Sequence, residues 1–200
     1  MATPAVPTFP VTVLAGPDQV TIRHLAAGDR AALLAFARSL PEHDLLFLQR
    51  DITQEDVVDE WLRETETEQV STLIAETPAG IVGYTTVYRS GLRWTAHVGE
   101  LRVVVGPQVR GRGLGRILTR HAFAIARARG IEKMMAQMTL DQEAAIATFQ
   151  GLGFRPEAVL REHVRDRAGR KHDLLVLSHD VARFETERAS YGIIDAFNRQ

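Results

Sequence analysis

The sequence predicts one mixed α/β domain, and three features of the chain carry that prediction. First, 200 residues with 45% hydrophobic and 24% charged side chains suit an ordinary globular fold with a sizeable core. Second, β-rich runs alternate with segments whose apolar residues recur at helical spacing. Third, a strand, a glycine-rich turn, a helix and another strand follow one another between residues 97 and 140, which is the order of a right-handed crossover.

The first half of the chain is expected to form four strands and two helices. Asp29 is suited to cap the first helix, which Pro41 then ends. Thr53 followed by acidic residues favours a second helix, and the break at residues 77–80 joins two β-rich runs into a hairpin. The expected strands are residues 19–25, 70–75, 81–88 and 97–105, and the expected helices are residues 31–39 and 57–62.

The second half is expected to form three strands and two helices. Apolar residues recur at helical spacing from residue 114 to residue 125, and Gly130 ends that helix. Asp141 is suited to cap a second helix, which Gly151 and Gly153 close. The expected strands are residues 133–140, 159–164 and 174–178, with a hairpin turn at residues 167–170 between the last two.

The two ends of the chain differ from the expected domain at residues 19–180. Residues 1–18 hold four prolines but no Lys or Arg, so we expect an extended N-terminal arm and not a secretory signal. Residues 181–200 are weakly amphipathic, and we expect a C-terminal helical tail there. Such a tail could dock on a second subunit, so a homodimer is one expectation. The cytoplasm is the default location.

Composition excludes several classes of partner and chemistry. A net charge of −1 gives no long-range attraction to nucleic acid or to an anionic membrane, so we expect neither partner. The absence of cysteine excludes disulfides and cysteine nucleophiles. His163, His172 and Asp173 fit no zinc spacing, so we expect no metal.

The clearest functional signal is the turn at residues 110–115, which reads RGRGLG. Its alternating glycines lack Cβ atoms and let backbone N–H groups approach a ligand. The N–H groups of the first helical turn, with the helix dipole, favour an anion at that place. Arg110, Arg112 and Arg116 add charge-assisted donors. The turn therefore indicates a phosphate site, although a tight turn with solvated arginines is the simpler alternative.

The same turn resembles the acetyl-CoA loop of the GNAT superfamily of N-acetyltransferases, whose pattern is Gln/Arg-x-x-Gly-x-Gly/Ala. Residues 101–107 resemble the family's central strand and the turn after it, and residues 142–154 resemble its later helix and the Gly-Phe that follows. The close match covers residues 97–155. The resemblance implies that residues 19–180 are an acetyltransferase domain. It also implies a GNAT-like mixed central sheet, splayed between the fourth and fifth strands, with helices on both faces.

The resemblance also implies ligands and their binding residues. Acetyl-CoA would be the cosubstrate, and the acceptor would be a primary amine of a small molecule or peptide. The loop amides would hold the pyrophosphate, and the strand backbone would pair with the pantetheine arm as an added strand does. The coenzyme A-binding residues are then Val103, Val104, Val105, Arg110, Gly111, Arg112, Gly113, Leu114, Gly115, Arg116, Gln142 and Phe149.

The resemblance is weaker for the catalytic residues. Phe149 stands where many family members carry a tyrosine that protonates the leaving thiolate, and Gln142 stands where many carry an asparagine. Glu100 on the central strand is the best remaining general base, and its alternative role is that of a solvated glutamate or one in an ion pair with Arg102 or Arg93. His97 is the second candidate for the base.

Two functions of other classes stay open at this point. Because Phe149 replaces the tyrosine, a non-catalytic acyl-CoA-binding module is one alternative function. A generic nucleotide-binding domain is the weaker alternative, because the turn has no Gly-Lys-Ser/Thr and its glycines lack the Gly-x-Gly-x-x-Gly spacing. The acceptor is not named by the sequence, since the segments expected around it carry no known motif.

Overall fold

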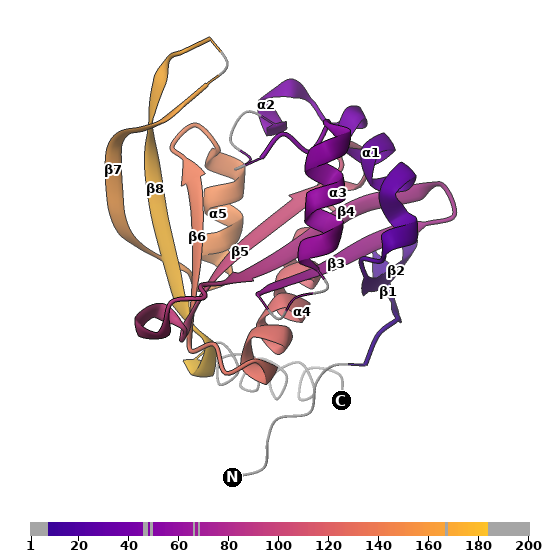
Figure 1. The fold of residues 1–200 in the computed structure, drawn as a ribbon, viewed down its shortest axis with the longest axis horizontal. Helices are drawn as coiled ribbons and strands as arrows, with labels where there is room; N and C mark the ends of the chain where they lie inside the picture. The colour runs from indigo at the N-terminus through magenta and orange to yellow at the C-terminus, as the bar shows by residue number, and fades with distance from the viewer. Residues whose placement is uncertain are drawn as a thin grey trace, which may run out of the picture.

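The computed structural model describes residues 8–45, 48, 50–65, 67, 69–166 and 168–183. In these residues one eight-stranded sheet carries helices on both faces (Figure 1). The strands are β1 (Val11–Ala15), β2 (Asp18–His24), β3 (Val70–Thr77), β4 (Gly80–Arg89), β5 (Val98–Val105), β6 (Lys133–Thr139), β7 (Arg155–Arg165) and β8 (Lys171–Asp180). The α-helices are α1 (Arg30–Ser39), α2 (Glu42–Leu45), α3 (Glu55–Glu64), α4 (Leu114–Ala128) and α5 (Glu143–Gly151).

The sheet is mixed, as the sequence predicts. Its strand order is β1-β2-β3-β4-β5-β6-β8-β7, and only β5 and β6 run parallel. Parallel neighbours cannot be joined by a short hairpin, so α4 crosses from one to the other. The remaining neighbours are antiparallel, and the β3–β4 and β7–β8 pairs are the two expected hairpins.

Each face of the sheet buries its own set of apolar side chains. Helices α1 and α3 cover one face, where Trp61 of α3 is 1% exposed and lies edge-on to Tyr84 at 4.9 Å. Helices α4 and α5 lie against the other face, where Phe123 and Phe149 each pack edge-on against Phe154. Residues next to each other in β4 and β5 therefore point into different cores, as the period of a strand requires.

The N-terminal segment adds a strand that the sequence analysis does not contain. Part of the expected arm at residues 1–18 forms β1, which pairs antiparallel with β2. Val11 and Val13 pack against the core, whereas Leu14 is 71% exposed, so an outward-facing leucine hides the alternation of an edge strand. The short helix α2 is also new. Of the expected tail at residues 181–200, all but residues 181–183 lie outside the described residues.

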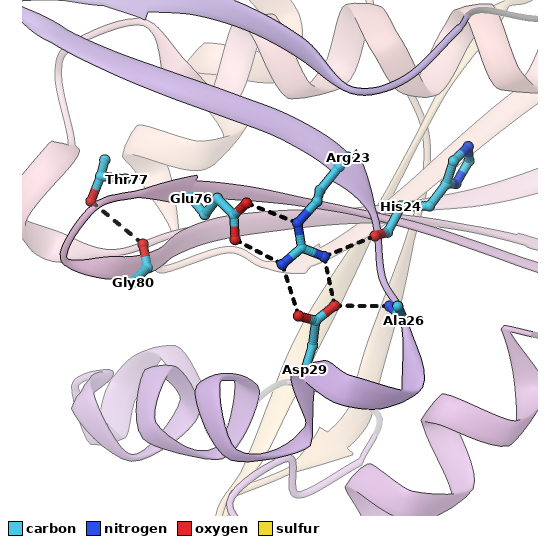
Figure 2. A network of polar contacts seen from close by, with 7 residues as sticks. All are labelled: Arg23, His24, Ala26, Asp29, Glu76, Thr77 and Gly80. Carbon is cyan, nitrogen blue, oxygen red and sulfur yellow. Dashed lines mark hydrogen bonds and ion pairs between the residues drawn. The ribbon is translucent and has the colours of Figure 1, made fainter.

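One ion-pair network ties the start of α1 to the sheet (Figure 2). The Arg23 guanidinium donates to both carboxylate oxygens of Glu76 at 2.8 Å, and to those of Asp29 at 2.7 and 2.8 Å. Asp29 also accepts a hydrogen bond from the Ala26 N–H at 2.9 Å. The hydrogen bonds from Arg23 lower the pKa of the Asp29 carboxyl, and its burial opposes that shift.

This network predicts a pH-dependent stability difference. Asp29→Asn should lower the free energy of unfolding at pH 7 by about 1–3 kcal/mol, because a buried charged hydrogen bond is lost. The folded pKa of Asp29 lies below its unfolded value. Its stabilisation is therefore complete above the unfolded pKa and disappears as pH falls through the folded pKa. Urea unfolding from pH 7 downwards should show the two proteins converging below about pH 4.

The control for this prediction is Asp59→Asn, which breaks an ion pair with Arg30 between side chains that are 45% and 40% exposed. An exposed pair of this kind contributes little to stability, because solvent screens its charges. If both variants lose the same free energy of unfolding at pH 7, the Asp29 network stabilises the fold no more than an exposed ion pair does.

Candidate functional site

The functional site begins at the gap between β5 and β6. The two strands pair at only three rungs, from Val98↔Lys133 to Glu100↔Met135. Beyond them β5 runs on to residue 105 and β6 to residue 139, and no ladder bonds join them. Each strand stays held on its other side, β5 by β4 and β6 by β8. The facing backbone edges are thus open to an extended ligand, and the splay expected between the fourth and fifth predicted strands is confirmed.

The glycine turn lies at the open end of this gap. Gly111 and Gly113 have φ of 72° and 83°, a region that favours glycine, and a Cβ added to either would meet nothing within 4 Å. Helix α4 makes its first hydrogen bond from the Ile117 N–H to the Gly113 carbonyl at 3.1 Å. The three preceding amides, at residues 114–116, come before that bond and are left for a ligand. The turn therefore has the space and the donors that an anion requires.

Two arginines of the turn already contact carboxylates. Arg110 forms an ion pair with Asp44 of α2, and its Nε donates to the Val105 carbonyl at 3.1 Å. Arg112 forms an ion pair with Asp18 of β2. Both guanidiniums thus lie where they attract negative charge, and in this structure acidic side chains provide it. Arg116 is exposed, and Leu114 is buried in the core beneath the turn.

A set of charged residues gathers near the closed end of the gap, on the face covered by α1 and α3. We call Arg50, Glu64, Tyr88, Glu100 and Arg102 the charge cluster. The Arg102 Nη2 donates to Glu100 at 2.8 Å, and Arg50 lies 2.9 Å from Glu64 and 5.9 Å from the centre of the Tyr88 ring. Burial raises the pKa of the Tyr88 hydroxyl; the charges of Arg50 and Arg102 oppose that rise, and those of Glu64 and Glu100 add to it.

Register explains how the charge cluster forms. Tyr88 of β4 lies directly opposite Glu100 of β5, and Glu100 is also the last β5 residue that pairs with β6. Arg102 follows two residues later on the same face of the strand. Glu100 therefore stands where the gap opens, with 24% of its side chain exposed, and the expected ion pair with Arg102 is present.

The remaining predicted residues lie in three places. Val103 and Val105 face the core under α4, and Val104 faces the core under α1 and α3. Gln142 directly precedes α5 and accepts a hydrogen bond from the Thr139 N–H at 3.2 Å, so it lies at the open end of β6. Phe149 is 7% exposed and packs in the core that includes Val103.

His97 is not brought together with the other candidates along the open edge. It is exposed and precedes β5, at the end where β5 and β6 are still paired. Its backbone carbonyl accepts hydrogen bonds from the N–H groups of Glu132 and Lys133 at 2.8 and 3.1 Å. The structure thus gives the main chain of His97 a role in joining the two strands.

The sequence analysis did not find Arg50, Glu64, Tyr88 and Asp44. No motif marks them, because each reaches the site from a different element. One signal was available: the register of the expected hairpin and the next strand could have placed Tyr88 beside Glu100.

The described residues contain no group of three or more His, Asp or Glu side chains placed to hold a metal ion. None of their helices has both the length and the apolar character needed to cross a membrane.

Comparison with known proteins gives one consistent family. Residues 35–154 match the sequence profile described as the acetyltransferase (GNAT) family. The mycothiol acetyltransferase of Thermobispora bispora is 32% identical over 152 residues, which cover 74% of this chain and 50% of the relative. That of Streptomyces avermitilis is 31% identical, over 69% of this chain and 44% of the relative. This chain spans about half the length of the curated relatives it matches.

Solved structures show the same fold. The ribosomal-protein-alanine N-acetyltransferase of Brucella melitensis superposes with a TM-score of 0.70 at 27% identity, covering 80% of this chain and 98% of the other. A GNAT-family acetyltransferase of Streptococcus pneumoniae also gives 0.70, at 22% identity, covering 80% and 99%.

The geometry of the turn predicts that Gly113→Val abolishes anion binding there. The branched side chain would fill the open space beside the free amides of α4. We expect coenzyme A, the anion implied by the resemblance, to bind at least about tenfold more weakly, a loss of roughly 1.4 kcal/mol or more. Thermal stabilisation by coenzyme A measures this directly.

Gly169→Val is the matched control, because Gly169 has φ of 82° and equally open surroundings in the β7–β8 hairpin. Both variants suffer the same backbone strain, so only the difference between them reports on the ligand. Equal coenzyme A binding in the two folded variants would place the phosphate elsewhere.

Proposed function

This chain belongs to the GNAT acetyltransferase family, and from that premise we propose that it moves an acetyl group from acetyl-CoA to a primary amine of a small molecule or peptide by direct attack. The observation that carries the proposal is the three-rung pairing of β5 with β6. It leaves two strand edges open, and the glycine turn with the free amides of α4 lies at the open end. A long ligand with an anionic end and a peptide-like arm fits that arrangement.

Acetyl transfer from a thioester to an amine determines which steps the protein must assist. The neutral amine nitrogen bonds to the thioester carbon, the carbon–sulfur bond breaks, and its electron pair leaves on the thiolate of coenzyme A. One proton must leave the nitrogen. Neutralising a lysine-type amine of pKa about 10.4 at pH 7 costs about 4.6 kcal/mol, against about 1.4 kcal/mol for an amine of pKa about 8. The need for a base therefore depends on the acceptor.

We assign the roles as follows. Backbone amides of residues 110–116 bind the pyrophosphate, and the open edge of residues 103–105 pairs with the pantetheine arm, as an added strand would. Gln142 faces the same arm from the start of α5. Glu100 accepts the amine proton, supported by its place at the end of the paired rungs. His97, beyond that end, is the second candidate.

Residue 149 on α5 is a phenylalanine, so this position offers no hydroxyl to protonate the leaving thiolate. Its ring has no proton to give, and it is buried against Phe154. The thiolate is then released without protonation from this residue, and Phe149 contributes by packing beside the gap. Positioning of the two reactants becomes the main source of rate enhancement.

The proposal predicts turnover. Incubation of the protein with acetyl-CoA and a panel of primary amines should release free thiol and N-acetylated product in equal amounts for at least one amine. Mass spectrometry of the product and a thiol reagent measure the two. Tight coenzyme A binding without transfer to any amine would instead indicate a non-catalytic acyl-CoA-binding module.

The assignment of Glu100 predicts a pH signature. Glu100→Gln keeps the shape but removes the ionisable group, so the rate at pH 7 with an amine of pKa about 10 should fall at least about a hundredfold. An amine of pKa about 8 should lose less, because more of it is already neutral. Raising the pH should restore part of the rate for the stronger base.

The control is Glu157→Gln, which removes a carboxylate paired with Lys133 at 2.6 Å, away from the gap on β7. Its rates should stay at the wild-type level. An unchanged profile between pH 6 and 9 in folded Glu100→Gln would remove Glu100 from the chemistry, leaving His97 or water to take the proton.

A further inference from the structure

The charge cluster contains an unusual concentration of polar atoms without hydrogen-bond partners. In the part of the chain that the structure describes, six buried side-chain atoms lack such a partner, and three of them belong to Arg50, Glu64 and Arg102. The Arg50 and Glu64 atoms lie 2.9 Å apart and still share an ion pair. The Arg102 Nε has no such partner. Buried donors are nearly always satisfied in folded proteins, so this one calls for an explanation.

Arg23 shows how the same chain treats a structural arginine. All three nitrogens of its guanidinium donate hydrogen bonds, to two carboxylates and to a backbone carbonyl (Figure 2). Arg102 is more deeply buried, with 13% of its side chain exposed against 29% for Arg23. Yet only its Nη2 donates to a described residue, namely Glu100. Its Nη1 donates to none of them, and the 13% of the side chain that is exposed excludes the buried Nε.

The guanidinium that carries the unused Nη1 lies beside the proposed base, Glu100. The Arg102 Nη2 is 2.8 Å from the Glu100 carboxylate, so the two functional groups meet in one small space. An acceptor that places its amine against Glu100 brings the atoms next to that amine towards the guanidinium. A carbonyl or carboxylate oxygen three bonds from the nitrogen would be within reach of it.

We propose that Arg102 determines acceptor specificity by binding an oxygen adjacent to the amine, so that the acceptors are α-amino carbonyl compounds: amino acids, their amides and peptide N-termini. The inference rests on the proposed function. A charge-assisted hydrogen bond from the Arg102 Nη1 to that oxygen would use a donor that the described residues leave unpaired, whereas the Nε stays buried.

Charge disfavours the other common amines. Each carboxylate of the cluster is already matched by a guanidinium, Glu100 by Arg102 and Glu64 by Arg50. The cluster therefore has no net negative charge to attract a polyamine, and a second ammonium group would lie near an arginine. A lysine side chain has four methylene groups behind its amine and offers no nearby oxygen.

Three matched acceptors test the proposal: alaninamide, isopropylamine and 1,4-diaminobutane. Isopropylamine has the branched carbon of alaninamide without its carbonyl. For wild type, kcat/KM per neutral amine should be highest for alaninamide. Arg102→Met should lower it about 10- to 100-fold for alaninamide, mainly through KM, since one charge-assisted hydrogen bond is lost. The value for isopropylamine should fall by a smaller factor, because it loses the effect of Arg102 on Glu100 but has no oxygen for Arg102 to bind.

Two further variants keep the test decisive. Arg102→Lys retains the charge and should give an intermediate ratio of alaninamide to isopropylamine. Arg23→Met should reduce stability but leave that ratio unchanged. Because the ratio is taken within one protein sample, partial unfolding cancels from it, including in Arg102→Met.

The outcomes distinguish a failure of the acceptor assignment from a failure of the proposed acetyl transfer. An equal loss for both amines in Arg102→Met would show that Arg102 only positions Glu100, and a wild-type preference for 1,4-diaminobutane would also overturn the proposal. If no amine is acetylated by wild type, the proposed function itself has failed. If only amines without an adjacent oxygen are acetylated, the function stands and this inference falls.

Discussion

The limited pairing of β5 with β6 is the constraint on which the rest of this structure depends. A parallel pair that continued along both strands would close the sheet, and no backbone edge would be left for a ligand. Here pairing ends after the Glu100↔Met135 rung, while β4 and β8 hold the two strands from outside. The opening is therefore stable without the ligand, since each strand keeps one full ladder. The position of the last rung also decides which residues stand where the gap opens.

Arginine has three distinct environments in this chain, and they correspond to three uses. Arg23 is saturated by two carboxylates and fixes the start of α1 to the sheet. Arg110 and Arg112 meet one acidic residue each on the exposed glycine turn, in pairs that a phosphate group can replace at small cost. Arg102 is 13% exposed, donates to Glu100 through its Nη2 and leaves its Nε without a partner among the described residues. In that respect it differs from Arg23, whose guanidinium nitrogens all donate.

The geometry of the turn at residues 110–115 could be predicted because it depends on local structure. Its glycine spacing and the helix start that follows favour an anion site, which stays a prediction. Strand β1 was missed because the outward-facing Leu14 disguises its alternation. Only part of the charge cluster could be predicted: strand register can place Tyr88 beside Glu100, whereas Arg50 meets Tyr88 and Glu64 only after α3 packs on the sheet. Contacts of that kind are decided by tertiary packing and leave no pattern along the chain.

Strand β5 connects the two halves of the proposed reaction. Its open edge and the turn after it would hold acetyl-CoA, whereas its side chains at positions 100 and 102 face the layer of α1 and α3, where an acceptor would bind. The thioester and the amine then meet across one strand, and their relative position is fixed by backbone that β4 holds on its other side. Such rigidity provides the positioning on which an enzyme without a tyrosine at Phe149 must rely. On the proposed assignment, acceptor selectivity would rest on few side chains, because an amine that reaches the end of the gap would meet Glu100 and Arg102 together.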